Sequence, residues 1–168
     1  IDDEPIFRAE LAQAIERNVF VPIRLSNELE KMGESLKRGV LFAGDYGVGK
    51  THLASHIARV ATDAGWTFIY VKDSRELPQA LRYAQLYQPV VVFAEDVDRI
   101  AGKTRDSEVN ELLNQLDGID SKTGRIMTIL TSNHADQIND AMRRPGRIDL
   151  VLEVLPPDAE TVQAMITS

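Results

Sequence analysis

The chain has 168 residues, 43% of them hydrophobic, which suits one main domain with a complete core. Its net charge of −7 argues against a protein that holds nucleic acid by diffuse attraction to phosphates, so we do not expect nucleic acid as a partner. The chain contains no cysteine, which excludes disulfides and cysteine-based metal sites, and its apolar runs are too short to span a bilayer, so we expect a soluble, cytoplasmic protein without a membrane segment.

Apolar, β-rich runs alternate with segments of helical periodicity along the chain. An N-terminal helix is expected over 5–18, because Ile6, Phe7, Leu11 and Ile15 share one helical face. The expected strands are 39–43, 67–72, 90–94, 126–131 and 150–154, with helical stripes at 51–61, 77–87 and 109–116, the last behind a candidate cap at Ser107. This alternation indicates an α/β fold, a doubly wound parallel sheet with helices on both faces.

A pair of prolines marks the end of the fifth strand. Pro156 and Pro157 stop the strand, and Asp158 is a candidate cap for a helix that begins at Ala159. We therefore expect one α/β domain over 1–156 and the start of a truncated helical domain over 157–168.

A glycine-rich loop follows the first strand. Residues 44–51 read Gly-Asp-Tyr-Gly-Val-Gly-Lys-Thr and fit the pattern G-x-x-x-x-G-K-[ST], in which backbone N–H groups and a helix N-terminus hold nucleotide phosphates. Lys50 would then meet the phosphates, and Thr51 would offer its hydroxyl to Mg²⁺. The alternative is a chance glycine-rich turn. The residues expected to bind the nucleotide are Gly44, Asp45, Tyr46, Gly47, Val48, Gly49, Lys50, Thr51 and His52.

Acidic residues follow the third strand directly. The run 90–94 ends in Glu95, Asp96, Val97 and Asp98. Carboxylates at the carboxyl end of a buried parallel strand, next to a phosphate loop, are placed to hold Mg²⁺ and to polarise water. The alternative is a set of acids that merely ends a strand.

Two further segments carry polar groups that suit a phosphate site. Asn133 follows the fourth strand, although an isolated Asn in this place is usually a turn former. The segment 141–149 contains Arg144 and Arg147 on either side of a Pro-Gly turn, and planar guanidinium groups match phosphate oxygens. The alternative for the arginines is a solvated basic turn with an internal salt bridge, for example to Asp149.

Together these segments resemble the AAA family of ATPases over nearly the whole chain. The resemblance implies a sheet order of 5-1-4-3-2, a metal-side role for Glu95, a water-activating role for Asp96, and water positioning by Asn133. It implies that Arg144 and Arg147 act in trans on a neighbouring subunit's γ-phosphate. The family usually has Asp-Glu where this chain has Glu-Asp, and a shift of a carboxylate by about 1 Å can cost on the order of a hundredfold in rate. Binding of the nucleotide and its hydrolysis are therefore separate expectations.

The function that the resemblance implies is Mg²⁺-dependent ATP hydrolysis by a ring of identical subunits, a hexamer, coupled to remodelling of a protein partner. The cofactors are then ATP or ADP and Mg²⁺, and no Asn-Lys-x-Asp guanine-reading segment is present. The aromatic-apolar-Gly triplet of peptide-threading members is absent from 73–89, and the lid that follows the fifth strand in the family is mostly missing. The alternatives are a non-hydrolysing nucleotide switch or assembly scaffold, and a replication initiator or helicase loader. His52 and His56 are spaced for a shared metal, but no third ligand is apparent.

Overall fold

The computed structural model describes residues 6–45, 49–98, 106–119, 124–134, 140, 142–144 and 146–167. Its centre is a parallel sheet of five strands in the order β2-β3-β4-β1-β5, which confirms the predicted fold class and the predicted order of 5-1-4-3-2. The strands are β1 (Arg38–Ala43), β2 (Thr67–Val71), β3 (Val90–Ala94), β4 (Ile126–Ser132) and β5 (Leu150–Glu153).

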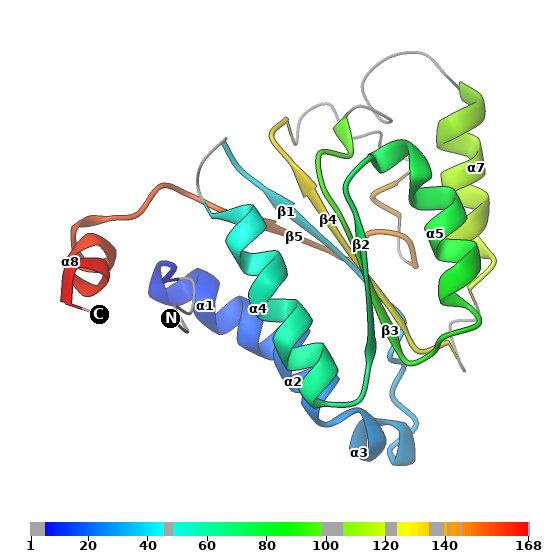
Figure 1. The fold of residues 1–168 in the computed structure, drawn as a ribbon, viewed down its shortest axis with the longest axis horizontal. Helices are drawn as coiled ribbons and strands as arrows, with labels where there is room; N and C mark the ends of the chain where they lie inside the picture. The colour runs from blue at the N-terminus through cyan, green and yellow to red at the C-terminus, as the bar shows by residue number, and fades with distance from the viewer. Residues whose placement is uncertain are drawn as a thin grey trace.

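Helices cover both faces of the sheet (Figure 1). One face carries α4 (Lys50–Asp63) and an N-terminal helical segment, and the other carries α5 (Leu77–Ala84) and α7 (Asp106–Asp117). A 3₁₀ turn, Ser74–Glu76, precedes α5, and α8 (Ala159–Thr167) follows β5. Within the described ranges no helix combines the length and the apolar character needed to cross a membrane. The boundary between domains 1–156 and 157–168 stays a prediction.

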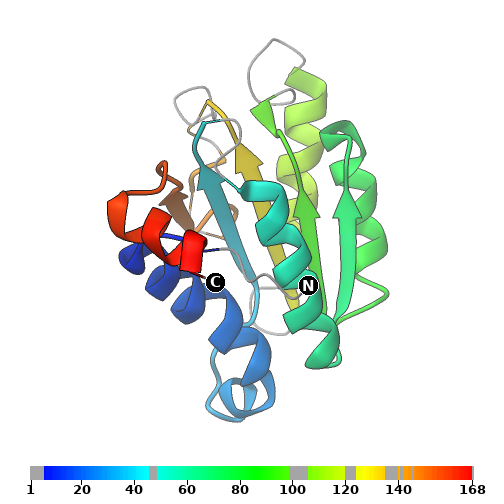
Figure 2. The same ribbon diagram turned by 60° about the vertical axis from the view of Figure 1, so that its left-hand side comes forward.

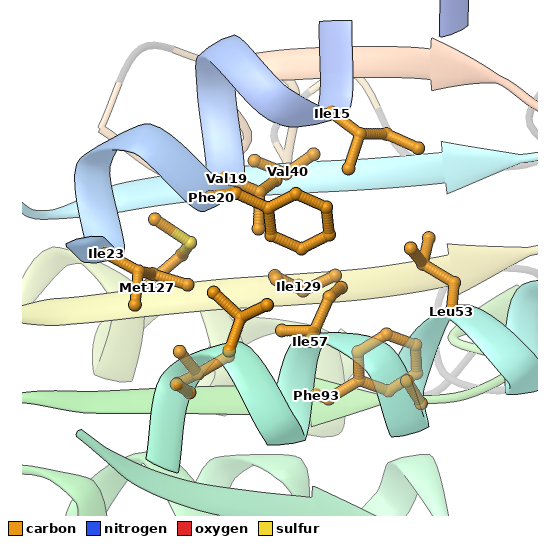
Figure 3. Close-up of a cluster of buried hydrophobic side chains, with 14 of the residues drawn as sticks. Ile15, Val19, Phe20, Ile23, Val40, Leu53, Ile57, Phe93, Met127 and Ile129 are labelled. Carbon is orange, nitrogen blue, oxygen red and sulfur yellow. The ribbon is translucent and has the colours of Figure 1, made fainter. Parts of the chain in front are cut away.

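The core has two layers because successive strand residues face opposite sides of the sheet. In the first layer, shown in Figure 3, side chains of the N-terminal segment and α4 meet the sheet. In β1, Val40 and Phe42 belong to this layer, whereas Leu41 belongs to the second. The second layer packs the sheet against α5 and α7, and its helical members include Leu77, Leu81, Leu112 and Leu116.

The N-terminal helical segment is longer than the sequence pattern predicts. It comprises α1 (Ala9–Ile15), a π-helical turn (Glu16–Phe20), α2 (Val21–Arg24) and α3 (Ser26–Lys31), whereas the prediction ended at residue 18. Its apolar stripe continues through Val19 and Ile23, which are completely buried against the first layer. Pro22 lies in the first turn of α2, where a missing N–H costs least, and the π turn comes directly before it.

Two smaller predictions about helix ends were wrong. The helix predicted over 77–87 ends at Ala84, and Tyr87 is 56% exposed rather than part of the buried stripe. Ser107 lies inside α7, which includes Asp106, so Ser107 does not cap it.

The backbone at the start of β1 packs directly against the backbone of the turn that precedes β5. A Cβ atom at Gly39 would lie 1.8 Å from the carbonyl oxygen of Arg147, which no side chain can occupy. The same contact is fastened by three hydrogen bonds. The Gly39 N–H donates to Asp149 Oδ2 at 2.8 Å, the Asp149 N–H donates to the Gly39 carbonyl at 2.8 Å, and the Gly146 N–H donates to Asp149 Oδ1 at 2.8 Å. Gly39 therefore fixes the position of the arginine-bearing turn.

We predict that Gly39→Ala destabilises the protein by about 2–3 kcal/mol, because backbone atoms rather than a flexible side chain must move. Gly33→Ala is the matched control, since Gly33 has open space around its Cβ position and a φ of 78°. Loss of glycine's freedom at positive φ should cost about 1 kcal/mol there. Urea unfolding of both variants measures the difference. If both variants lose the same free energy of unfolding, the close approach of the Gly39 and Arg147 backbones does not limit the residue type at position 39.

Candidate functional site

A cavity of about 290 Å³ lies where β3 and β4 end and α4 begins. In Figure 2 the strands point toward this edge of the sheet, and α4 starts there. The cavity collects residues from separate sequence motifs. Its lining residues are Gly49, Lys50, Thr51, His52, Glu95, Asp96, Thr131 and Asn133.

Lys50 is the buried cation of this cavity. Its Nζ donates to the carbonyl oxygens of Gly44 at 2.5 Å and Asp45 at 2.8 Å, and to Asn133 Oδ1 at 2.7 Å. An ammonium has three donors, so these contacts use all of them. Burial lowers the pKa of Lys50, and the nearby carboxylates, Asp96 first among them, oppose that effect.

Asn133 connects the lysine with the acidic residues after β3. Its side-chain oxygen accepts from Lys50, and its Nδ2 donates to Asp96 Oδ1 at 2.7 Å. One amide therefore links the helix after β1, the end of β3 and the end of β4. Lys50, Asp96 and Asn133 therefore lie together at the carboxyl edge of the sheet.

Asp98 holds the end of β4 in place. Its Oδ2 accepts the N–H of Asn133 at 3.0 Å, and its Oδ1 accepts the hydroxyl of Ser132. These contacts hold Asn133, which carries the bridging amide, and Ser132, which precedes it. Asp98 is thus a positioning residue for Asn133, a role that the sequence did not reveal.

Asp96 adopts a left-handed backbone conformation with φ of 50°. Two neighbours outside β3 stabilise it. The Asp96 N–H donates to Thr131 Oγ1 at 3.1 Å, and Ser74 Oγ donates to the Asp96 carbonyl at 3.2 Å. Asp is among the few residue types that tolerate this conformation, so the backbone turns after Glu95 without a glycine.

Glu95 reaches the cavity with one oxygen atom left without a donor. Its Oε1 is buried and accepts no hydrogen bond from the described residues. A buried carboxylate oxygen normally has a partner, since leaving it unpaired costs free energy. Glu95 and Thr51 line the same cavity, so both predicted Mg²⁺ ligands face one space.

The glycine-rich loop is described only in part, because Tyr46, Gly47 and Val48 lie outside the described residues. Gly44 and Asp45 contribute carbonyl oxygens to Lys50, and His52 lines the cavity. Gly49 has φ of 94° and stands immediately before α4, so the chain enters the helix through a conformation that favours glycine.

The two arginines predicted to act on phosphate do not line this cavity. Arg147 lies beside Gly39, at the opposite end of β1 from Gly44. Gly39 and Gly44 are five residues apart along the strand, which corresponds to roughly 17 Å. Arg144 is exposed on the same turn, where its carbonyl accepts the Arg147 N–H at 3.1 Å.

Arg147 forms an internal salt bridge, but with a different partner from the one the sequence suggested. Its Nε donates to Asp117 Oδ1 at 2.9 Å, and its Nη2 donates to Asp117 Oδ2 at 2.5 Å. This hydrogen bond lowers the pKa of Asp117. Asp149 was the suggested partner, and it instead accepts backbone N–H groups of Gly39 and Gly146.

Among the residues that the structure describes, no group of three His, Cys, Asp or Glu side chains is close enough together to hold a metal ion. His56 packs edge-on against Phe20, with ring centroids 4.9 Å apart, and its Nδ1 lies 3.0 Å from the Arg59 guanidinium.

Comparison with known proteins places these features in a family. The model of the "ATPase family associated with various cellular activities (AAA)" matches residues 40–155. The chain is 32% identical over 179 residues to the nuclear valosin-containing protein-like protein of Mus musculus, covering 95% of the chain and 20% of that protein. It is 30% identical over 171 residues to the probable 26S proteasome regulatory subunit 10B of Caenorhabditis elegans, covering 91% of the chain and 42% of that protein.

A third relative is the probable inactive ATP-dependent zinc metalloprotease FTSHI 5, chloroplastic, of Arabidopsis thaliana, at 37% identity over 150 residues, covering 76% of the chain and 11% of that protein. The chain therefore spans less than half the length of each of these relatives. The family match covers most of the chain, including β1, β3, β4 and the cavity that they form. The chain belongs to the AAA family of ATPases.

Proposed function

We propose that this chain binds Mg²⁺-ATP in the cavity at the carboxyl edge of the sheet and hydrolyses it. The observation that carries the proposal is the bridge from Lys50 through Asn133 to Asp96, which unites a cation, an amide and a carboxylate around one space. A phosphate needs the cation, and an attacking water needs the amide and the carboxylate. The bridge supplies all three from the start of α4 and the ends of β3 and β4.

Lys50 would bind the phosphates by exchanging carbonyl partners for phosphate oxygens. Its present acceptors at Gly44 and Asp45 are neutral carbonyls, and a charged oxygen forms a stronger hydrogen bond with an ammonium. The lysine is buried, so water competes little with the phosphate.

Asp96 would take the proton from the attacking water. The water oxygen forms a bond to the γ-phosphorus, the bond to the ADP oxygen breaks, and the proton passes to the carboxylate. Asn133 already holds Asp96 Oδ1, and a carboxylate has further lone pairs with which to hold a water.

Glu95 and Thr51 are the residues that would hold Mg²⁺. The fit rests on Glu95 Oε1, a buried carboxylate oxygen without a donor among the described residues, since carboxylate and hydroxyl oxygens are ligands that this cation prefers. When bound, Mg²⁺ would neutralise charge on the phosphates.

Arg144 and Arg147 would complete the site of a neighbouring subunit in a ring, a hexamer by family resemblance. Their place at the far end of β1 supports action in trans, because they cannot reach the cavity of their own chain. Arg147, whose side chain is 15% exposed, would first have to leave Asp117, whose side chain is 54% exposed and in contact with water. We further propose that turnover drives remodelling of a protein partner, an idea supported by the relative named as a proteasome regulatory subunit.

A second candidate function is a nucleotide-dependent switch that does not hydrolyse ATP. The order Glu95-Asp96 favours it, because each exchanged acid alters the reach of a carboxylate by about one C–C bond. One relative, FTSHI 5, is also named as a probable inactive protein. Turnover by the wild-type protein distinguishes the two functions.

We predict that Lys50→Ala weakens binding of Mg²⁺-ADP by about 10–100-fold, because it removes a charged hydrogen bond to phosphate worth about 1.5–3 kcal/mol. Calorimetric titration measures the affinity. Lys31→Ala on α3 is the matched control, since Lys31 is an exposed lysine outside the cavity. Unchanged affinity in Lys50→Ala would remove the phosphate-binding assignment.

We predict that Asp96→Asn keeps nucleotide affinity within about threefold but lowers turnover by about 10²–10⁴-fold, the range for loss of a general base. Asn tolerates the left-handed conformation, and its oxygen can still accept from Asn133, so the local structure should survive. Phosphate release and calorimetry are measured in parallel, with Asp63→Asn at the exposed end of α4 as control. Wild-type turnover in Asp96→Asn would assign the base elsewhere.

We predict that the double variant Arg144→Ala/Arg147→Ala loses about 10³–10⁵-fold in turnover, as expected for loss of an arginine that stabilises the transferring phosphoryl group. The assay uses the intact natural protein. Mixed with Lys50→Ala protein, the double variant should regain part of its activity, because some interfaces then pair an intact loop with intact arginines. Full activity of the double variant alone, or no recovery after proven co-assembly, would contradict action in trans.

A further inference from the structure

We propose that Tyr70 is a positioning residue for Glu95, whose carboxylate it orients toward the cavity and a divalent cation. This inference rests on the proposed nucleotide function. It adds a residue from β2, a strand that contributed nothing to the site in the sequence motifs.

The register of β2 and β3 puts the two side chains on one face of the sheet. Tyr70 is directly opposite Phe93, and their rings are stacked with centroids 6.2 Å apart and an angle of 22° between the planes. Glu95 is two residues beyond Phe93, so its side chain emerges on the face that carries both rings.

The strand pairing continues far enough to keep Glu95 beside β2. The Glu95 N–H donates to the Val71 carbonyl at 3.2 Å. Tyr70 and Glu95 are therefore diagonal cross-strand neighbours, a relation that spans roughly 7–8 Å and is within reach of an aromatic side chain.

This placement brings the Tyr70 hydroxyl within reach of the Glu95 carboxylate, to which a phenolic O–H can donate. Glu95 Oε1 has no donor among the described residues, which leaves this oxygen for a cation while the tyrosine restrains the carboxylate.

A glutamate needs such a restraint more than an aspartate does. Its extra methylene adds a rotatable bond, and each freely rotating side chain must lose that freedom when it binds a metal. A partner that fixes the carboxylate beforehand reduces this cost. Outer partners of metal ligands typically contribute 10–100-fold to metal affinity. Tyr70 is 44% exposed, so we expect the lower end of that range.

Tyr70→Phe tests the proposal, because it keeps the ring on Phe93 and removes only the hydroxyl. Mn²⁺ is the probe, and its affinity for the protein–ADP complex is measured by electron paramagnetic resonance. We expect the affinity to fall about tenfold. The affinity for ADP in the presence of EDTA should stay within twofold of wild type, since Tyr70 does not line the phosphate end of the cavity. Tyr83→Phe on α5 is the matched control, because Tyr83 is an exposed tyrosine whose hydroxyl contacts Gln79.

A double-mutant cycle with Glu95→Gln distinguishes positioning from general damage. If Tyr70 acts through Glu95, Tyr70→Phe should change Mn²⁺ affinity by less than twofold in the Glu95→Gln background. Wild-type Mn²⁺ affinity in Tyr70→Phe would overturn the proposal, as would an equal loss in both backgrounds or a parallel loss of metal-free ADP binding.

The same measurements separate this inference from the proposed function. If wild-type protein does not bind ADP in EDTA, the nucleotide site itself is wrong, and the role of Tyr70 falls with it. If ADP binds and Mn²⁺ binds equally to wild type and Tyr70→Phe, the nucleotide site stands and Tyr70 has no part in it.

Discussion

The site depends on a buried ammonium that must find three acceptors at the edge of a parallel sheet. Lys50 is 8% exposed, so an unpaired donor there would be costly, and its acceptors come from the glycine-rich loop and from Asn133. The Asn133 amide also donates a hydrogen bond to Asp96. The two hydrogen bonds of this amide therefore join the ends of β3 and β4 to the start of α4. Because each partner is held by the next, displacement of one residue should alter the whole edge. Asp98 strengthens this coupling by holding the backbone of Asn133.

The strand β1 holds the glycine-rich loop and the arginine-bearing turn at a fixed separation. At its carboxyl end it leads into the phosphate loop, and at its amino end Gly39 fixes the turn that carries Arg147. A strand paired on both sides is stiff, because β4 and β5 bond to it along its length. In the proposed ring, this spacing would let an arginine of one subunit approach the phosphates bound by the next subunit. The ion pair with Asp117 would determine how readily the Arg147 side chain becomes available to a neighbouring subunit.

Sequence patterns predicted the sheet well because its central strands, β1, β3 and β4, are buried on both faces and form apolar runs between turn signals. The glycine-rich loop and the acids after β3, which contribute residues to one cavity, were singled out by motif. Other contacts were not predictable, because they depend on register and side-chain direction. The partner of Arg147 is Asp117 at the end of α7, 30 residues away, and no local pattern distinguishes it from Asp149. The roles of Asp98 and Tyr70 likewise depend on contacts with residues of adjacent strands. The N-terminal helical segment continues beyond the predicted end at residue 18, through a π turn and into α2 with Pro22 in its first turn.

The order Glu95-Asp96 fits the backbone that bears it. Asp96 has φ of 50°, a conformation that Asp and Asn adopt more readily than Glu, whose longer side chain gains less from local hydrogen bonds. The shorter acid therefore suits the turned position, where Asn133 fixes its direction. The longer acid stands at the last regular position after β3, where Val71 still pairs with its N–H and Tyr70 lies beside it. The extra reach of Glu95 and the reduced reach of Asp96 are thus each matched by a neighbour that orients the carboxylate, so the exchanged acids can serve one nucleotide site without a change in the strands that carry them.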